Sequence, residues 1–191
     1  MALLTAASSR AGRAAVVAAC LLLGLAPPTL AGDAASLEDA VKATYLYKFA
    51  PFVSWPQAAF RPDASAFTLC VSGADAVIAL LPEAVAGQQV AGRPIAIRRL
   101  ADNEAPAACQ ILYVANSAAA APQLAATRGK PILTVTPDDV ADHGIIRLTV
   151  IDHHVRFDVD AKLAGDSGLQ ISSKLLSLAH AVTPAPPQGR N

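Results

Sequence analysis

The chain has 191 residues, of which 53% are apolar, 5% aromatic and 16% charged, and its formal net charge is zero. A nucleic-acid-binding protein normally has a high isoelectric point and a stripe of basic residues, so this composition argues against that class of function. Much of the apolar content is alanine, which favours helices in the windows where it gathers.

The start of the chain has the three zones of a secretory signal peptide. Arg10 and Arg13 supply the positive zone, residues 14–26 form an apolar run, and a proline pair precedes the small-residue site that ends at Ala31. We therefore predict that residues 1–31 are a signal peptide, cleaved near Ala31, and that the mature protein works in the periplasm. About 160 residues remain, which is enough for one domain with a stable core.

Other export routes need a different pattern. The apolar run is shorter than the roughly 20 residues that cross a bilayer, which argues against an uncleaved anchor. Lipoprotein cleavage before Cys20 would leave the apolar residues 21–23 in the mature chain. Arg10 and Arg13 are not adjacent, so the twin-arginine route is disfavoured. The anchor and the lipoprotein stay open as alternatives at this point.

The first helix of the mature chain is predicted to follow a disordered start at residues 32–35. Ser36 stands where a helix N-cap belongs, with Asp39 three residues later as its partner. Pro51 must kink or end the helix because it lacks a backbone donor, and Trp55-Pro56 closes the segment. Apolar residues spaced by four and three mark one face of this helix: Leu37, Val41, Tyr45, Phe49 and Phe52.

Strand-like and helix-like stretches alternate after this helix. The predicted helices cover residues 74–86 and an alanine-rich stretch that Ser117 caps and that reaches about Arg128. The predicted strands cover residues 67–71, 94–98, 109–115 and 131–135. Such alternation predicts a single-domain α/β fold, a layered sandwich with a mixed, mostly parallel sheet flanked by helices.

The last part of the chain is predicted to add a late β-hairpin and one more helix. Residues 145–151 and 155–159 are strand-like and flank the polar residues 152–154, an interruption of hairpin length. A final helix covers about residues 172–182, and the proline-rich residues 183–191 form a disordered tail. The folded domain therefore spans residues 36–182.

Two cysteines remain once the signal peptide is set aside, Cys70 and Cys109. An even pair in an oxidising compartment is more often bridged than free, which favours a disulfide bond. Two buried thiols on neighbouring strands are the alternative.

Familiar catalytic patterns are missing from the sequence. There is no G-x-S-x-G elbow and no phosphate-binding glycine loop, and residues 71–75 lack the glycine spacing of a dinucleotide fingerprint. His153 and His154 are adjacent, so on a strand they point to opposite faces and cannot hold one metal ion together. We therefore expect no catalytic residue, no metal and no cofactor. A serine, a histidine and a carboxylate that only the fold brings together stay open, and they would make the protein a hydrolase.

Five segments carry a resemblance to a known family. They are residues 41–56 (VKATYLYKFAPFVSWP), 67–73 (FTLCVSG), 90–100 (VAGRPIAIRRL), 109–115 (CQILYVA) and 155–179 (VRFDVDAKLAGDSGLQISSKLLSLA). In this order and spacing they resemble the YfiR-like family of periplasmic regulators. The resemblance covers nearly all of the predicted domain, residues 36–182.

The resemblance implies a repressor of a membrane-bound diguanylate cyclase. Such a protein engages the periplasmic sensory region of the cyclase and so restrains cyclic-di-GMP synthesis and biofilm formation. An outer-membrane lipoprotein can relieve the repression by sequestering the regulator, and the family is dimeric with a disulfide-stabilised α/β fold. Cys70 and Cys109 match one family bridge, whereas a second family bridge has no cysteines here, because residues 145–160 contain none.

Aromatic residues at the broken end of the first helix are the candidates for partner binding. Phe49, Phe52 and Trp55 can serve as anchors in an interface. The alternative is that Tyr45, Phe49 and Phe52 pack the helix onto the sheet, as we also expect of Leu169, Ile171 and Leu175 near the last helix. A different function also stays open, that of a periplasmic small-molecule-binding protein that signals to another receptor.

Overall fold

The computed structural model describes residues 31–60, 66–115 and 117–185, so the predicted signal peptide lies outside the described residues except for Ala31. Its helices are α1 (Ala31–Lys48), α2 (Ala76–Ala84), α3 (Ala120–Thr127), α4 (Ala161–Asp166) and α5 (Ser173–Leu178), with 3-10 turns at Ala50–Phe52 and Gln57–Ala59. Its strands are β1 (Val53–Ser54), β2 (Phe67–Ser72), β3 (Gln89–Val90), β4 (Arg93–Arg99), β5 (Ile111–Val114), β6 (Leu133–Pro137), β7 (Ile146–Ile151), β8 (His154–Asp160), β9 (Gln170–Ile171) and β10 (Ala181–Thr183).

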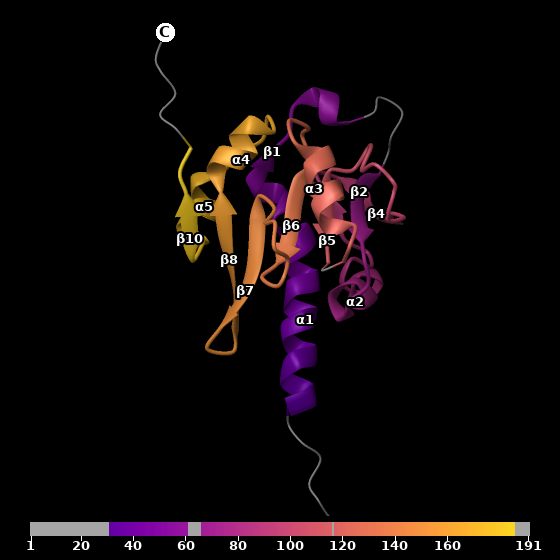
Figure 1. Ribbon diagram of the computed structural model, residues 1–191, viewed down its shortest axis with the longest axis vertical. Helices are drawn as coiled ribbons and strands as arrows, with labels where there is room; N and C mark the ends of the chain where they lie inside the picture. Colours follow the sequence, from indigo (N-terminus) through magenta and orange to yellow (C-terminus); the bar gives the residue numbers. More distant parts are fainter. Residues whose placement is uncertain (1–30, 61–65, 116, 186–191) are drawn as a thin grey trace, which may run out of the picture. The chain divides into compact units, whose positions relative to one another are not determined.

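The main sheet confirms the predicted fold class. Its strands lie in the order β10-β8-β7-β6-β5-β2-β4-β3, as the ribbon in Figure 1 shows for its larger strands. The pairs β2–β4, β2–β5, β5–β6, β6–β7 and β8–β10 are parallel, whereas β7–β8 and β3–β4 are antiparallel. The sheet is therefore mixed and mostly parallel, and β7 with β8 forms the expected late hairpin.

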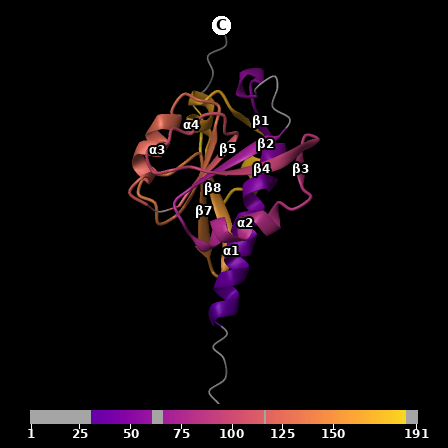
Figure 2. The same cartoon turned by 90° about the vertical axis from the view of Figure 1, so that its right-hand side faces the viewer.

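Both faces of the central strands are buried, which explains why their sequences are apolar without alternation. Leu69 and Tyr113 face a core that also contains side chains of α1 and α2. Cys70 and Leu112 face the other way, into a second cluster that contains Leu124 of α3. Helices thus cover both faces of the sheet, with α3 on the side opposite to α1 and α2 (Figure 2).

Helix α1 begins at Ala31, so the predicted N-cap at Ser36 and the predicted disorder of residues 32–35 are wrong. Alanines upstream of Ser36 extend the helix, since alanine has the highest intrinsic helix propensity. The predicted apolar face is also displaced at its start, because the Leu37 side chain is 66% exposed. The residues that α1 buries completely lie in its second half: Ala43 and Leu46.

The capping residues of α2 and α3 differ in their chemistry. Asp75 caps α2, accepting a hydrogen bond from the Ile78 backbone at 2.8 Å, and its other oxygen accepts one from the Tyr113 hydroxyl at 2.6 Å. Burial, together with this bond, raises the pKa of Tyr113 far above its usual range. Helix α3, in contrast, starts after Ala119 without a side-chain cap, so the predicted cap at Ser117 is wrong.

The chain end departs from the predicted long helix. Ser172 does cap α5, but that helix ends at Leu178, and Ala181–Thr183 forms a strand parallel to β8. Thr183, predicted to open the disordered tail, therefore belongs to the sheet, and residues 186–191 lie outside the described residues. The β-branched pair Val182-Thr183 favours a strand, and β8 offers it a free edge.

The turn of the late hairpin has two residues with positive φ. Asp152 and His153 have φ values of 50° and 59°, the backbone that a two-residue hairpin turn requires. The His153 ring is 93% exposed, whereas the His154 Nδ1 lies 2.6 Å from the Asp152 carbonyl. Within the described ranges, no cluster of three or more histidine, cysteine or acidic side chains could hold a metal ion. None of the helices described here is long and apolar enough to span a membrane.

Gly144 fits a space that no side chain can share. A Cβ at this residue would lie 2.7 Å from the Thr134 carbonyl oxygen of β6. We therefore expect Gly144→Ala to lower the free energy of unfolding by about 1–3 kcal/mol, measured by urea denaturation. Gly165→Ala in α4 is the control, because its Cβ meets no atom within 4 Å and should leave stability unchanged or slightly higher. Equal losses in both variants would contradict this account.

Candidate functional site

After the proline break that follows α1, the first part of the domain pairs with a segment near the end of the domain. The helix stops at Lys48, and the 3-10 turn Ala50–Phe52 redirects the chain into β1. There Val53 pairs with Ile171 and Ser54 with Gln170, in a two-stranded antiparallel sheet. The Ser172 backbone also donates a hydrogen bond to the Phe52 carbonyl at 2.9 Å. The segment that carries the predicted anchors is therefore fixed by residues from the far end of the chain.

Phe49 lies inside the protein. Its side chain is 3% exposed, and its ring packs on Tyr45 at 5.7 Å and on Phe157 of β8 at 5.1 Å between centroids. Tyr45 and Phe157 are themselves in edge contact at 6.2 Å. A ring enclosed in such a cluster holds α1 against the sheet. It can therefore change the binding of a partner only indirectly, by supporting the elements that carry exposed residues.

Phe52 and Trp55 are partly exposed. The Lys174 ammonium of α5 lies 5.8 Å from the centre of the Phe52 ring, within the range of a cation–π contact. Trp55 packs edge-on against Phe67 at 5.5 Å and Phe60 at 6.5 Å. The structure thus leaves these two predicted anchors accessible on one side while their other side is supported by the fold.

A cavity of about 420 Å³ lies beside Trp55. Its walls are mainly apolar and come from the turn after α1, from β2 and from the β3–β4 hairpin. Arg93 lines it as well, with its guanidinium 5.2 Å from the centre of the Phe60 ring. The size is that of a small-ligand pocket or of a socket for an aromatic side chain.

Positively charged side chains lie near several aromatic rings of the region after α1. Besides the contacts of Lys174 and Arg93, the Lys48 ammonium lies 5.1 Å from the centre of the Tyr47 ring. We call the exposed parts of Phe52, Trp55 and Phe60, with the cations Lys48, Arg93 and Lys174, the α1-end surface. It combines apolar anchors with positive charge, so it is suited to a protein partner that offers apolar side chains among carboxylates.

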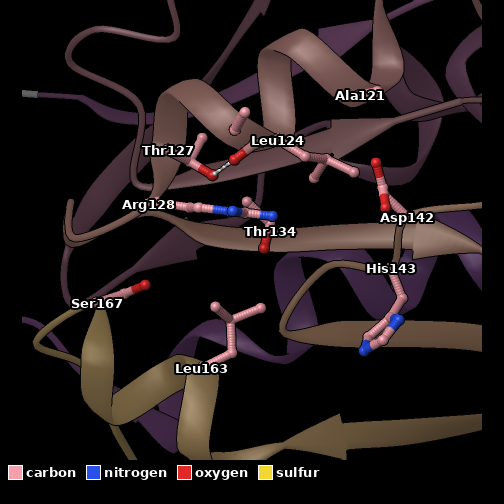
Figure 3. A pocket seen from close by; sticks show the side chains of 10 residues that line it. Ala121, Leu124, Thr127, Arg128, Thr134, Asp142, His143, Leu163 and Ser167 are labelled. Atoms are coloured by element: carbon pink, nitrogen blue, oxygen red, sulfur yellow. Dashed lines mark hydrogen bonds between the residues drawn. The ribbon is translucent and has the colours of Figure 1, made fainter.

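The structure does not place a serine beside a histidine in the cavity between α3 and α4. His143 and Ser167 both line this cavity, but they lie at opposite ends of it (Figure 3). The His143 Nε2 instead lies 3.8 Å from an Asp160 oxygen. The hydrolase alternative therefore gains no support from the histidine that this cavity contains.

The two cysteines form the disulfide bond that the sequence favours. Cys70 of β2 and Cys109, just before β5, are both buried and their Cα atoms are 5.7 Å apart. This separation is ordinary for a disulfide, and the alternative of two free thiols does not hold. The bond links β2 to the segment just before β5, on the α3 side of the sheet.

Sequence reasoning missed four members of the α1-end surface: Lys48, Phe60, Arg93 and Lys174. Lys174 lies on α5 and reaches Phe52 only because β9 pairs with β1, and no local pattern announces that pairing. Arg93 is the first residue of β4, a strand predicted to begin one residue later. Phe60 stands just after the proline-rich turn and could have been suspected as a further aromatic in the same segment.

Comparison with known families shows to which family the chain is similar. The family model described as DUF4154, YfiR/HmsC-like, matches residues 39–180, which is nearly the whole folded part of the chain. No curated protein matches the chain significantly.

Proposed function

Because the chain belongs to the YfiR/HmsC-like family, we propose that it is a periplasmic regulatory binding protein that represses an inner-membrane diguanylate cyclase through the periplasmic sensory domain of that enzyme. The family suggests a periplasmic regulator rather than an enzyme. The signal peptide predicted at residues 1–31 supports the location. The proposed activity is binding alone, without a catalytic residue, metal or cofactor.

The α1-end surface is the observation that carries the proposal. The Trp55 ring packs against Phe67, and the pairing of β1 with β9 fixes the backbone between Phe52 and Trp55, which supports a role for both rings as preformed anchors. Rigid aromatic residues lose little entropy on binding and supply most of the affinity at many interfaces. We propose Phe52 and Trp55 as the anchors, whereas Phe49 supports the surface from the core.

Repression by such a protein needs only a difference in affinity. A regulator that binds the inactive state of the sensory domain more tightly by about 3 kcal/mol shifts its two-state equilibrium roughly 150-fold. One anchor and a few charge contacts supply a difference of this size. An outer-membrane lipoprotein that sequesters the regulator and a homodimer remain predictions from the family resemblance.

Deleting the gene is expected to raise cellular cyclic-di-GMP, measured by mass spectrometry, and the wild-type gene should restore the low level. The Phe52→Glu gene should fail to restore the low cyclic-di-GMP level. The substitution removes the aromatic ring, and with it both the apolar contact with the partner and the cation–π contact with Lys174. In vitro, this variant should bind the purified sensory domain about 30-fold more weakly. Leu37→Glu is the matched control, since Leu37 is exposed on α1 outside the α1-end surface.

The possible outcomes separate the function from the surface. Unchanged cyclic-di-GMP in the deletion strain would contradict repression. Normal repression by Phe52→Glu would agree with the proposed function but would show that Phe52 is not part of the interface.

A second candidate function is that of a small-molecule-binding protein that signals to another receptor. The apolar cavity beside Trp55 is the observation that favours it. It would be preferred if the deletion left cyclic-di-GMP unchanged and the purified protein retained an extracted periplasmic compound.

A further inference from the structure

The cavity between α3 and α4 lies apart from the α1-end surface and has a volume of about 250 Å³. It is formed by α3, by the loop between β6 and β7, and by α4. Residues that define its chemistry are Leu124, Arg128, Thr134, Asp142, His143 and Leu163. The volume lies just below the range typical of drug-sized ligands, so only a small molecule fits.

Among the described residues that line this cavity, Arg128 is the one lysine or arginine. It follows the last residue of α3, and its side chain points into the cavity toward Thr134 (Figure 3). The guanidinium has no hydrogen bond or ion pair with any residue of the ranges 31–60, 66–115 and 117–185. Arg128 is exposed and lines the cavity, and an arginine fork without a partner is matched in geometry by a carboxylate.

The remaining walls limit what else the ligand can carry. Leu124 and Leu163 face one another across the cavity and offer an apolar surface for a short aliphatic chain. The Thr127 hydroxyl donates its hydrogen to the Leu124 carbonyl at 2.7 Å, whereas the Thr134 hydroxyl accepts a hydrogen bond from the Ile145 amide at 2.9 Å and keeps its own hydrogen as a neutral donor. Recognition of a charged group therefore rests mainly on Arg128.

The far end of the cavity disfavours a second negative charge. The Asp142 carboxylate lines it there, and Asp160 lies 3.8 Å from His143 at the same end. A dicarboxylate or a phosphate dianion would bring its extra charge toward these two acids, which costs free energy. The walls thus favour a ligand with a single negative charge.

From these contacts we infer that the cavity between α3 and α4 binds a small monocarboxylate with a short aliphatic chain, with Arg128 as the carboxylate-binding residue. The inference is independent of the proposed repression, because none of these residues belongs to the α1-end surface. It gives the protein a place where a small acid can bind while the partner surface stays free.

Isothermal titration calorimetry of the purified protein with pentanoate tests this site. We expect saturable binding of one pentanoate, with Kd on the order of 1 mM for so small a ligand. Pentanamide, which has the same shape without the charge, should bind at least tenfold more weakly, as should glutarate and inorganic phosphate. Arg128→Gln should weaken pentanoate binding about 10- to 100-fold, the loss typical of a charge-assisted pair.

Arg156→Gln on β8 is the matched control, since it removes one exposed arginine from another part of the protein. It should leave pentanoate binding unchanged. Methyl NMR signals of Leu124 and Leu163 should shift on titration in the wild type and stay still in Arg128→Gln, which also shows whether that variant is folded. The inference is overturned by absent pentanoate binding, by equal binding in Arg128→Gln, or by tighter binding of phosphate or pentanamide.

Discussion

Replacing Cys70 and Cys109 together by alanine is expected to lower the free energy of unfolding by about 4 kcal/mol. The bond closes a loop with a sequence separation of 39 residues, and on the chain-entropy model a loop of this length restricts the unfolded state by about that amount. In a domain of this size the loss corresponds to a fall in Tm of roughly 10 °C, measured by circular dichroism.

Reduction provides the control for this experiment. Dithiothreitol should lower the Tm of the wild type and leave that of the double variant unchanged, because only the wild type has a bond to break. Thiol titration of the unreduced, denatured mature protein should find almost no free thiol. A double variant as stable as the oxidised wild type would show that the bond does not stabilise the fold.

Phe49→Ala is expected to lower the free energy of unfolding by about 3–5 kcal/mol, the usual cost of removing a buried phenylalanine ring. The reason is the enclosed cluster with Tyr45 and Phe157, which would lose its central member and leave a cavity. Urea denaturation measures the loss.

Phe52→Ala separates a structural role from a binding role in the same segment. Its ring is partly exposed, so we expect it to cost no more than about 1 kcal/mol of stability while it weakens partner binding. A Phe49→Ala protein of normal stability that fails to bind the sensory domain would contradict the burial of Phe49 and place its ring in the interface.

The parts of the fold that the sequence predicts are those with a strong local pattern. The apolar runs of β2 and β5, the hairpin around Asp152 and the break at Pro51 each follow from neighbouring residues alone. The parts it misses depend on distant partners. β1 and β9 have two residues each and exist only because they pair, and β10 forms because β8 offers an edge.

The candidate site divides in the same way. Aromatic residues at a proline break indicate a surface segment, and this holds for Phe52 and Trp55. Phe49 is buried because of the angle at which α1 is rotated about its own axis against the sheet. A shift of one residue along the helix would change this angle, and the spacing of the apolar residues does not fix it. No pattern in the sequence indicated a role for Arg128, because the residues around it in the cavity come from three separate elements.

The pairing of β1 with β9 has a consequence for unfinished chains. Synthesis runs from residue 1 toward residue 191, so Phe52 emerges early and stays without its supporting strand until Gln170 and Ile171 follow. A product that ends before Gln170 contains Phe52, Trp55 and Phe60 of the α1-end surface and lacks β9, the partner strand of β1. We therefore expect truncated copies to bind the proposed partner more weakly than the full chain does.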